Sequence, residues 1–295
     1  MIRFPAVILE RIKIPRVIFS IRVPPPSDHQ KMLSLMKKGY EMGVWCFDLP
    51  STKHLESFKE LRRLTDDETL VGLGHVEVEH GVSFFGKPLH QFETKVISTI
   101  SRNFPLSDSI QVFSPGSISS EVFTQKEIDR ITFDPLRFDK TLTLFNPKEF
   151  PFLLIGEKYG EWLLALGRID ILKEMTSRVR ELGFIPIFSG QWATYVLPKA
   201  KPLDVAAYAI PINKKWSLFN LAQACNLIKK FDKPVISLNP LVDGKLLINS
   251  EEAFSFLFDE LKILAAIPGI TSEEEFRGIL EVVGKFPPLI HPRKT

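Results

Sequence analysis

The sequence of 295 residues lacks the features that mark several protein classes. Its two cysteines, Cys46 and Cys225, are too few for a disulfide scaffold or a cysteine metal site. The formal net charge is only +3, which gives no general attraction to nucleic acid or to an anionic membrane. No uncharged stretch approaches the ~20 residues that a membrane helix needs, and the N-terminal apolar run stops at Glu10, too early for a signal peptide. We therefore expect a cytoplasmic protein whose partner is a small-molecule ligand.

The residue types that are abundant describe an ordinary folded chain. Hydrophobic residues make up 44% of the sequence and charged residues 25%, which are typical globular values. Phenylalanine occurs 24 times and proline 22 times, whereas asparagine and glutamine are sparse. This composition favours a thermophilic source. The oligomeric state has no signal in the sequence.

Strand-like and helical patterns alternate along most of the chain, which is the rhythm of βαβ units and a parallel sheet. The strand-like segments at the two ends of the chain are residues 17–23, 44–50, 69–77, 184–188, 205–211, 233–239 and 264–267. Amphipathic helical patterns separate most of them. The economical interpretation is one (β/α)8 TIM barrel, an α/β fold that spans residues 1–295 as a single domain. A doubly wound sheet is the alternative, but no G-x-G-x-x-G motif follows the first strand.

The middle of the chain is less regular. Residues 93–103 have a helical pattern, while residues 141–145 and 151–155 are both strand-like. Long connections are uncommon unless they are functional. We therefore predict an insertion over residues 79–140, after the third strand, that covers the barrel mouth.

Four segments resemble the aldo-keto reductases, and they occur in the order and spacing of that superfamily. Residues 1–16 resemble its N-terminal β-hairpin, which plugs the bottom of the barrel. Residues 43–48, Gly-Val-Trp-Cys-Phe-Asp, are similar to its second strand, which ends in a catalytic aspartate. Residues 233–244 resemble the seventh strand, and residues 267–276 resemble the eighth strand with the turn that holds the cofactor's adenosine phosphate. The resemblance implies a TIM barrel, a catalytic role for the aspartate and NADPH as a cofactor.

The residues of the family's catalytic set, Asp, Tyr, Lys and His, are only partly present. Asp48 matches the aspartate, but residues 49–54 contain no tyrosine and His75 stands near the lysine position. The histidine position falls at residues 146–147 if residues 141–145 form the fourth strand. The leading hypothesis is a small-molecule enzyme with diverged chemistry. The alternatives are a catalytically silent barrel that binds a metabolite or a protein, and a metal-dependent hydrolase or lyase.

The densest polar cluster is residues 75–80, His-Val-Glu-Val-Glu-His. Strand alternation places His75 and Glu77 on one face, and barrel chemistry lies at the carboxyl ends of the strands. With Asp48 they are predicted to form a catalytic acid–base group, because imidazole beside carboxylates has a tunable protonation state. The same residue types also suit a metal ion. The third interpretation is an exposed hairpin with alternating charge.

Two further groups of residues are candidates for binding. Cofactor phosphate is expected after strands seven and eight, where Asn239, Lys245, Gly269 and Thr271 lie. Three glutamates at residues 273–275 oppose an anion there.

A substrate is expected to meet residues at the ends of two other strands. Arg22 ends the first strand and is able to pair with Asp48 or to clamp a carboxylate or phosphate. Gln191 and Trp192 follow the strand at residues 184–188, and an amide beside an aromatic wall is common in binding pockets.

Overall fold

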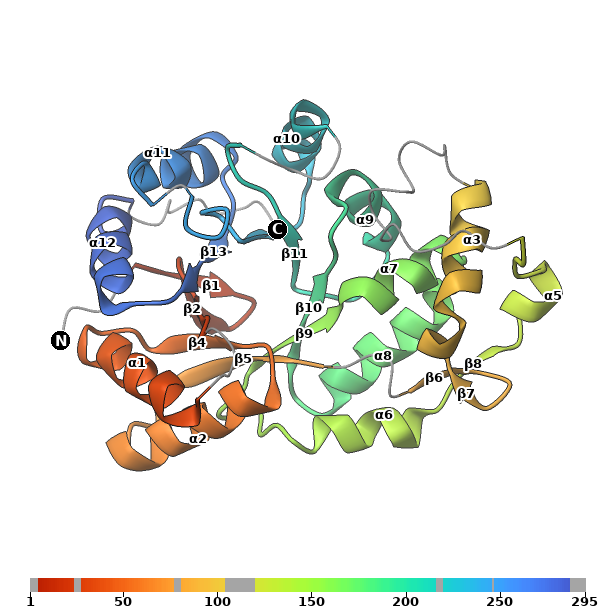
Figure 1. Cartoon of the computed structure of the whole chain (residues 1–295), viewed down its shortest axis with the longest axis horizontal. Helices are drawn as coiled ribbons and strands as arrows, with labels where there is room; N and C mark the ends of the chain where they lie inside the picture. Colours follow the sequence, from red (N-terminus) through yellow and green to blue (C-terminus); the bar gives the residue numbers. More distant parts are fainter. Residues whose placement is uncertain are drawn as a thin grey trace. The chain divides into compact units, whose positions relative to one another are not determined.

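Parallel strands alternate with helices along the chain, and together they form the α/β fold of a TIM barrel, which confirms the predicted fold class. The computed structural model describes residues 5–23, 28–76, 81–103, 120–215, 220–245 and 247–286. Figure 1 shows the fold, with labels on most of the elements. The chain divides into two compact units, which are described separately. Unit 1 consists of residues 1–74, 212–216 and 234–295, and unit 2 of residues 75–211 and 217–233.

The sheet of unit 1 is built from buried, mostly apolar strands. They are β3 (Phe19–Ile21), β4 (Cys46–Leu49), β5 (Val71–His75), β12 (Val235–Leu238), β13 (Ala265–Ile267) and β14 (Gly269–Ile270). β12 pairs with β13, and the order β14-β3-β4-β5 is parallel throughout. Pro268 separates β13 from β14 because proline has no N–H to donate to a ladder. The register places Asp48 between Ser20 and Leu73.

The helices of unit 1 are α1 (His29–Glu41), α2 (Thr52–Thr65), α11 (Ser250–Ser255), which continues as a π-helical turn (Phe256–Glu260), and α12 (Glu273–Val283). Side chains cap the first N–H groups of α1 and α12. Asp28 caps α1 by accepting the N–H of Gln30 at 2.9 Å. α1 and α2 lie side by side in Figure 1. α1 also packs closely on α12, because Gly39 lacks a Cβ that would lie 2.8 Å from the Phe276 ring.

An antiparallel hairpin precedes the first parallel strand, as the sequence predicts. It consists of β1 (Ala6–Leu9) and β2 (Ile12–Pro15), with Ala6 opposite Pro15. Glu10 turns the chain with φ +53°, the left-handed conformation that a tight turn requires. Its role as a plug of the barrel bottom stays a prediction.

The sheet of unit 2 is buried along its whole length. Its strands β9 (Phe152–Gly156), β10 (Ile185–Ser189) and β11 (Ala207–Pro211) are parallel, in the order β9-β10-β11. Full burial on both faces explains their continuous apolar sequences. The accompanying helices are α7 (Glu157–Ala165), α8 (Ile169–Glu181), α9 (Ala193–Ala200) and α10 (Leu221–Lys230).

The prediction of a strand at residues 141–145 is wrong. Helix α6 (Pro135–Leu142) runs into this segment. Asp134 caps it by accepting the N–H of Arg137 at 3.1 Å, and proline favours the first helical position. The fourth parallel strand is therefore β9, and it ends at Gly156 rather than near residue 146.

The segment between β5 and β9 carries a small sheet of its own. Strands β6 (Val82–Phe84), β7 (Lys87–Pro88) and β8 (Ile131–Phe133) are antiparallel, in the order β7-β6-β8. A 3-10 turn (Leu89–Phe92), α3 (Glu93–Asn103) and α5 (Gln125–Ile128) complete its described part. The described part of residues 79–140 thus has defined structure, and the prediction that these residues are an insertion over the barrel mouth stays a prediction.

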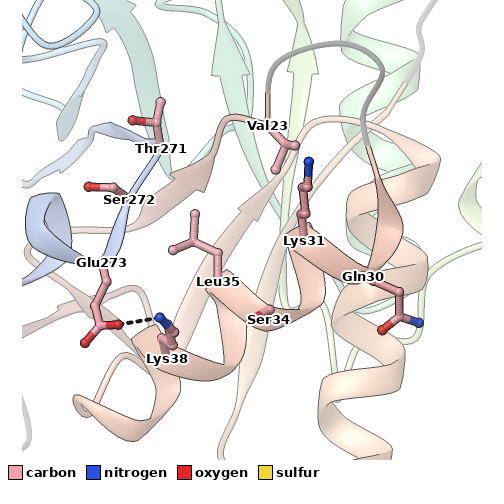
Figure 2. Close-up of a pocket in the computed structure, with 9 residues that line it drawn as sticks. All are labelled: Val23, Gln30, Lys31, Ser34, Leu35, Lys38, Thr271, Ser272 and Glu273. Atoms are coloured by element: carbon pink, nitrogen blue, oxygen red, sulfur yellow. Dashed lines mark hydrogen bonds and ion pairs between the residues drawn. The ribbon is translucent and has the colours of Figure 1, made fainter.

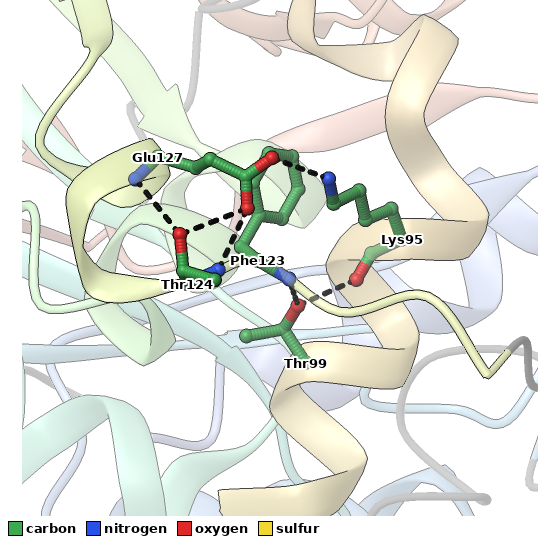
Figure 3. A network of polar contacts seen from close by, with 5 residues as sticks. All are labelled: Lys95, Thr99, Phe123, Thr124 and Glu127. Carbon is green, nitrogen blue, oxygen red and sulfur yellow. Dashed lines mark hydrogen bonds and ion pairs between the residues drawn. The ribbon is translucent and has the colours of Figure 1, made fainter.

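A polar network joins α3 to the start of α5, as Figure 3 shows. The backbone N–H of Phe123 donates to Thr99 Oγ1 at 2.7 Å, and this bond is buried. Thr124 and Glu127 form a capping box for α5. Lys95 donates to Glu127 Oε1 at 2.7 Å and lies 4.7 Å from the centre of the Phe123 ring. The network therefore fastens residues 120–128 to α3.

We predict that Thr99→Val destabilises the protein by about 1–3 kcal/mol, because a buried backbone N–H loses its acceptor. Chemical denaturation measures the change in the free energy of unfolding. Thr94→Val, at an exposed position of the same helix, is the matched control and is expected to change it by less than about 0.5 kcal/mol. Equal effects of the two substitutions would contradict the role given to Thr99.

Candidate functional site

The chain turns from β9 into α7 with no loop residue between them. Gly156 has φ +117° and Glu157 has φ +48°, both in the left-handed half of conformational space. A Cβ at position 156 would lie 2.5 Å from the backbone oxygen of Ser189, so only glycine fits. A non-glycine residue held in this region costs about 1–3 kcal/mol, and such residues cluster at functional sites. The strained turn places Glu157 at the carboxyl end of the fourth strand.

Glu157 meets the histidine that ends the third strand. The N–H of Val76 donates to the oxygen of Leu154 at 2.9 Å, which holds the two strand ends side by side. His75 Nδ1 lies 2.8 Å from Glu157 Oε1. A carboxylate only accepts hydrogen bonds, so His75 Nδ1 is the donor in this contact. In a neutral imidazole with its proton on Nδ1, the basic nitrogen is Nε2. We call this pair the His75–Glu157 dyad.

A second carboxyl group lies one helical turn further along α7. Glu161 is only 2% exposed, and its Oε1 accepts the N–H groups of Gln191 at 2.7 Å and Trp192 at 2.8 Å. Burial raises the pKa of Glu161 to about 7, against the lowering effect of these two hydrogen bonds. A Cβ at Gly190 would come within 3.2 Å of the same oxygen. The turn after β10 is thus built around one buried carboxyl group.

The structure brings the predicted residues Gln191 and Trp192 to this carboxyl group. Trp192 is 8% exposed and stacks on Tyr195, with ring centres 4.9 Å apart. The Gln191 side chain is exposed. Their role in lining a substrate pocket stays a prediction.

Sequence reasoning missed both glutamates of α7. Glu157 directly follows a buried strand. This position indicates a site residue once residues 151–155, rather than residues 141–145, are taken as the fourth strand. Glu161 is the single charge in the run Tyr-Gly-Glu-Trp-Leu-Leu at residues 159–164. A lone carboxyl group in an apolar run is a sign of burial with hydrogen-bond partners.

Asp48 lies in unit 1, near the carboxyl end of β4. It is 4% exposed. Burial, and next the charge of Asp48, raise the pKa of the Cys46 thiol well above its usual range. Cys46 is therefore a buried neutral thiol. Glu77, the third predicted catalytic residue, lies outside the described residues.

Arg22 is paired in unit 1 with a residue that sequence reasoning did not choose. Its guanidinium forms an ion pair with Asp243. Asn239 Nδ2 donates to Asp243 Oδ1 at 3.1 Å, and the Asp243 N–H donates back to Asn239 Oδ1 at 2.9 Å. The Arg22 side chain also rests on Gly269, where a Cβ would lie 2.3 Å from Nε. Two of the predicted binding residues, Arg22 and Asn239, therefore meet at one carboxylate, and a third, Gly269, lies against Arg22.

The remaining predicted cofactor residues lie in two turns of unit 1. Thr271 donates its N–H to Glu275 Oε2 at 2.6 Å and its hydroxyl to Oε1 at 2.9 Å. Ser272 accepts the N–H of Glu275 at 3.3 Å and so caps α12. Lys245 is exposed, and its N–H donates to the oxygen of Val242 at 3.1 Å.

An open groove of about 480 Å³ lies between α1 and the turn that joins β14 to α12. Figure 2 shows its lining: Val23, Gln30, Lys31, Ser34, Leu35, Lys38, Thr271, Ser272 and Glu273. Lys38 donates to Glu273 at 2.5 Å, and this hydrogen bond raises the pKa of Lys38 and lowers that of Glu273. The ion pair leaves the groove polar but nearly balanced in charge.

Metal-type side-chain clusters and membrane-length apolar helices are both absent from the described residues. No group of three or more His, Cys, Asp and Glu side chains gathers there in a way that suits a metal ion. No helix in the same residues has the length and apolar character needed to cross a bilayer.

Comparison with known proteins identifies the fold. No protein-family model matches the sequence, and no curated protein matches it. Solved structures do match. The aldo-keto reductase AKR11C1 from Bacillus halodurans, in its holo form, has a TM-score of 0.57 at 10% identity and covers 94% of this chain and 89% of its own. The thermostable aldo-keto reductase Tm1743 in complex with epalrestat has a TM-score of 0.55 at 13% identity, with 94% and 93% covered. The chain thus has the barrel fold of the aldo-keto reductases, at a remote distance in sequence.

We predict that the stability of the protein falls by roughly 2–3 kcal/mol as pH rises from about 4.5 through 7 because of Glu161. Its pKa in the folded state, about 7, exceeds the ordinary value of 4.5, so the folded protein holds this proton more tightly than the unfolded chain. Below pH 4.5 the group is protonated in both states and carries no penalty. Above pH 7 the buried group must ionise, and the full cost is present.

Glu161→Gln keeps an oxygen for the two N–H groups and removes the titration. The free energy of unfolding, measured by chemical denaturation at pH 5 and pH 8, should fall less in this variant than in the parent protein. Glu181→Gln, at an exposed position of α8, is the control and should keep the parent's difference. An identical pH dependence in the parent and in Glu161→Gln would refute the assignment.

Proposed function

We propose that the protein is a small-molecule enzyme of aldo-keto reductase-like fold with diverged chemistry, in which the His75–Glu157 dyad transfers a proton. The observation that carries the proposal is the 2.8 Å contact between His75 Nδ1 and Glu157 Oε1 at the carboxyl ends of β5 and β9. The carboxyl ends of the strands are where TIM-barrel enzymes hold their catalytic residues.

The geometry supports general base catalysis by His75. With its Nδ1 proton held by Glu157, the neutral ring presents Nε2 as the base, and the carboxylate stabilises the imidazolium that forms. The C–H bond next to a carbonyl breaks, its proton passes to Nε2, and its electron pair moves into the carbonyl to give an enolate. Return of the proton to carbon completes a cycle in which nothing is oxidised or reduced.

The name of the structural neighbours supports carbonyl compounds as the substrate class. Both neighbours are called aldo-keto reductases, a name that refers to aldehydes and ketones. Residues 49–54 of this chain offer no tyrosine to act as the acid of a reductase. A proton-transferring dyad needs no such phenol, and a redox-neutral reaction of a carbonyl compound is consistent with both facts.

The other predicted residues keep the roles that the sequence assigns to each of them. We propose a catalytic role for Asp48 and for Glu77, and a substrate-binding role for Arg22, Gln191 and Trp192. The segment between β5 and β9 is proposed to cover the barrel mouth. The proposal is supported by the positions of Asp48, Arg22, Gln191 and Trp192, each at or near the carboxyl end of a strand in its own unit.

We expect the protein to exchange the α-protons of some small aldehydes or ketones with solvent. A panel of such compounds, incubated with the protein in D2O, shows exchange as loss of the α-proton signal in NMR spectra. His75→Ala should lower the rate by about 100-fold or more, since general base catalysis contributes 10²–10⁴-fold. Glu157→Gln should lower it by about 10–100-fold, because the imidazolium loses its counter-charge.

Glu181→Gln, on an exposed face of α8, should leave the rate unchanged. Circular dichroism of each variant separates lost catalysis from lost folding. Absence of exchange across the whole panel, or full exchange by a folded His75→Ala, would contradict the proposed function and favour a barrel that only binds.

A further inference from the structure

The fold family implies a nicotinamide dinucleotide, so we asked whether the residues of unit 1 fit its phosphate groups. TIM barrels often bind phosphate in the loops after strands seven and eight, at backbone N–H groups that precede a helix. In chain order these strands are β12 and β13–β14, and the helix that follows is α12. The groups able to hold a phosphate there are the N–H and hydroxyl of Thr271, the guanidinium of Arg22 and the amide of Asn239.

At the start of α12 a carboxylate of the same chain already occupies the donors. Glu275 accepts both the N–H and the hydroxyl of Thr271, one with each oxygen, at 2.6 and 2.9 Å. This is the two-point contact that a phosphate would make at a helix N-terminus. Two of the nearby cations, Lys38 and Arg277, are also engaged, because both bind Glu273, at 2.5 and 2.8 Å.

After β12 a second carboxylate occupies the donors of Arg22 and Asn239. Asp243 binds the guanidinium of Arg22 and accepts from Asn239 Nδ2 at 3.1 Å. Asn239, Val242 and Asp243 all have positive φ, between +50° and +52°, and this turn fixes the carboxylate in place. The donors therefore do not fit a phosphate unless two carboxylates move away.

We infer that Asp243 and Glu275 are built-in anions that exclude phosphate groups from this end of unit 1, so that a ligand held there carries no nucleotide phosphate. The two residues determine specificity through charge and through occupancy of the donors. A phosphate that approaches either residue is repelled by a like charge at close range. Such repulsion is an effective way to exclude an unwanted ligand. The inference concerns unit 1 alone and does not depend on the His75–Glu157 dyad.

The experiment is a fluorescence titration of the protein with NADPH and NADH, with a calorimetric titration of inorganic phosphate as the minimal probe. The parent protein should show no saturable binding of any of them up to about 1 mM. Asp243→Asn with Glu275→Gln keeps the hydrogen-bonding shape and removes both charges. This double variant should bind NADPH or phosphate at least about tenfold more tightly than the parent.

Glu281→Gln, at an exposed position of the same helix, removes one charge away from the turn and should gain no affinity. If the double variant is unstable, the two single variants replace it, and each should show part of the gain in affinity. Binding of NADPH by the parent at micromolar concentration would overturn the inference. So would a folded double variant with no gain for either probe. Proton exchange by the dyad is measured separately, so the failure of one proposal is distinguishable from the failure of the other.

Discussion

The left-handed backbone at Gly156 and Glu157 is the constraint on which the candidate site depends. It ends a fully buried strand and begins α7 at the next residue, so the helix presents its carboxylates at the strand end itself. The first of them, Glu157, meets His75 at the end of β5, and the next, Glu161, holds the turn after β10. One helix therefore ties together the ends of three strands. The backbone oxygen of Ser189 leaves no room for any residue but glycine at the turn.

The two carboxyl groups of α7 show how environment assigns different chemical states to the same residue type. The Glu157 side chain is 56% exposed and has an imidazole as its partner. Glu161 is enclosed, and in the described part of the chain it accepts two backbone N–H groups and has no ion pair. Desolvation disfavours charge on Glu161 and raises its pKa to about 7. A helix of nine residues thus carries one solvent-exposed carboxyl group and one enclosed carboxyl group.

The barrel could be predicted from the sequence because its strands are short apolar runs with clear helical segments between them. The segment at residues 141–145 could not, since a short apolar run does not separate strand from helix, and the Asp134–Pro135 start of α6 was the better guide. The site was predictable in part. His75 was found because it ends a strand, but Glu157 lies 82 positions away, and that pairing depends on the tertiary fold. The lone charge of Glu161 in an apolar run indicates burial, but its partners are backbone N–H groups, and the sequence does not reveal which ones. Arg22 was expected to pair with Asp48 or to clamp a ligand, whereas its partner in the structure is Asp243, 221 positions away.

Because Arg22 contacts Gly269, we expect these two positions, which are distant in the sequence, to be substituted together. Any side chain at position 269 would drive the guanidinium out of its place, since a Cβ there lies 2.3 Å from Nε. Asp243 would then keep only its asparagine partner, and its negative charge would face whatever enters this end of the unit. Among relatives of this chain, glycine at 269 and a long cation at 22 should be gained or lost together. A paired change at these two positions would indicate that the charge of the ligand has changed.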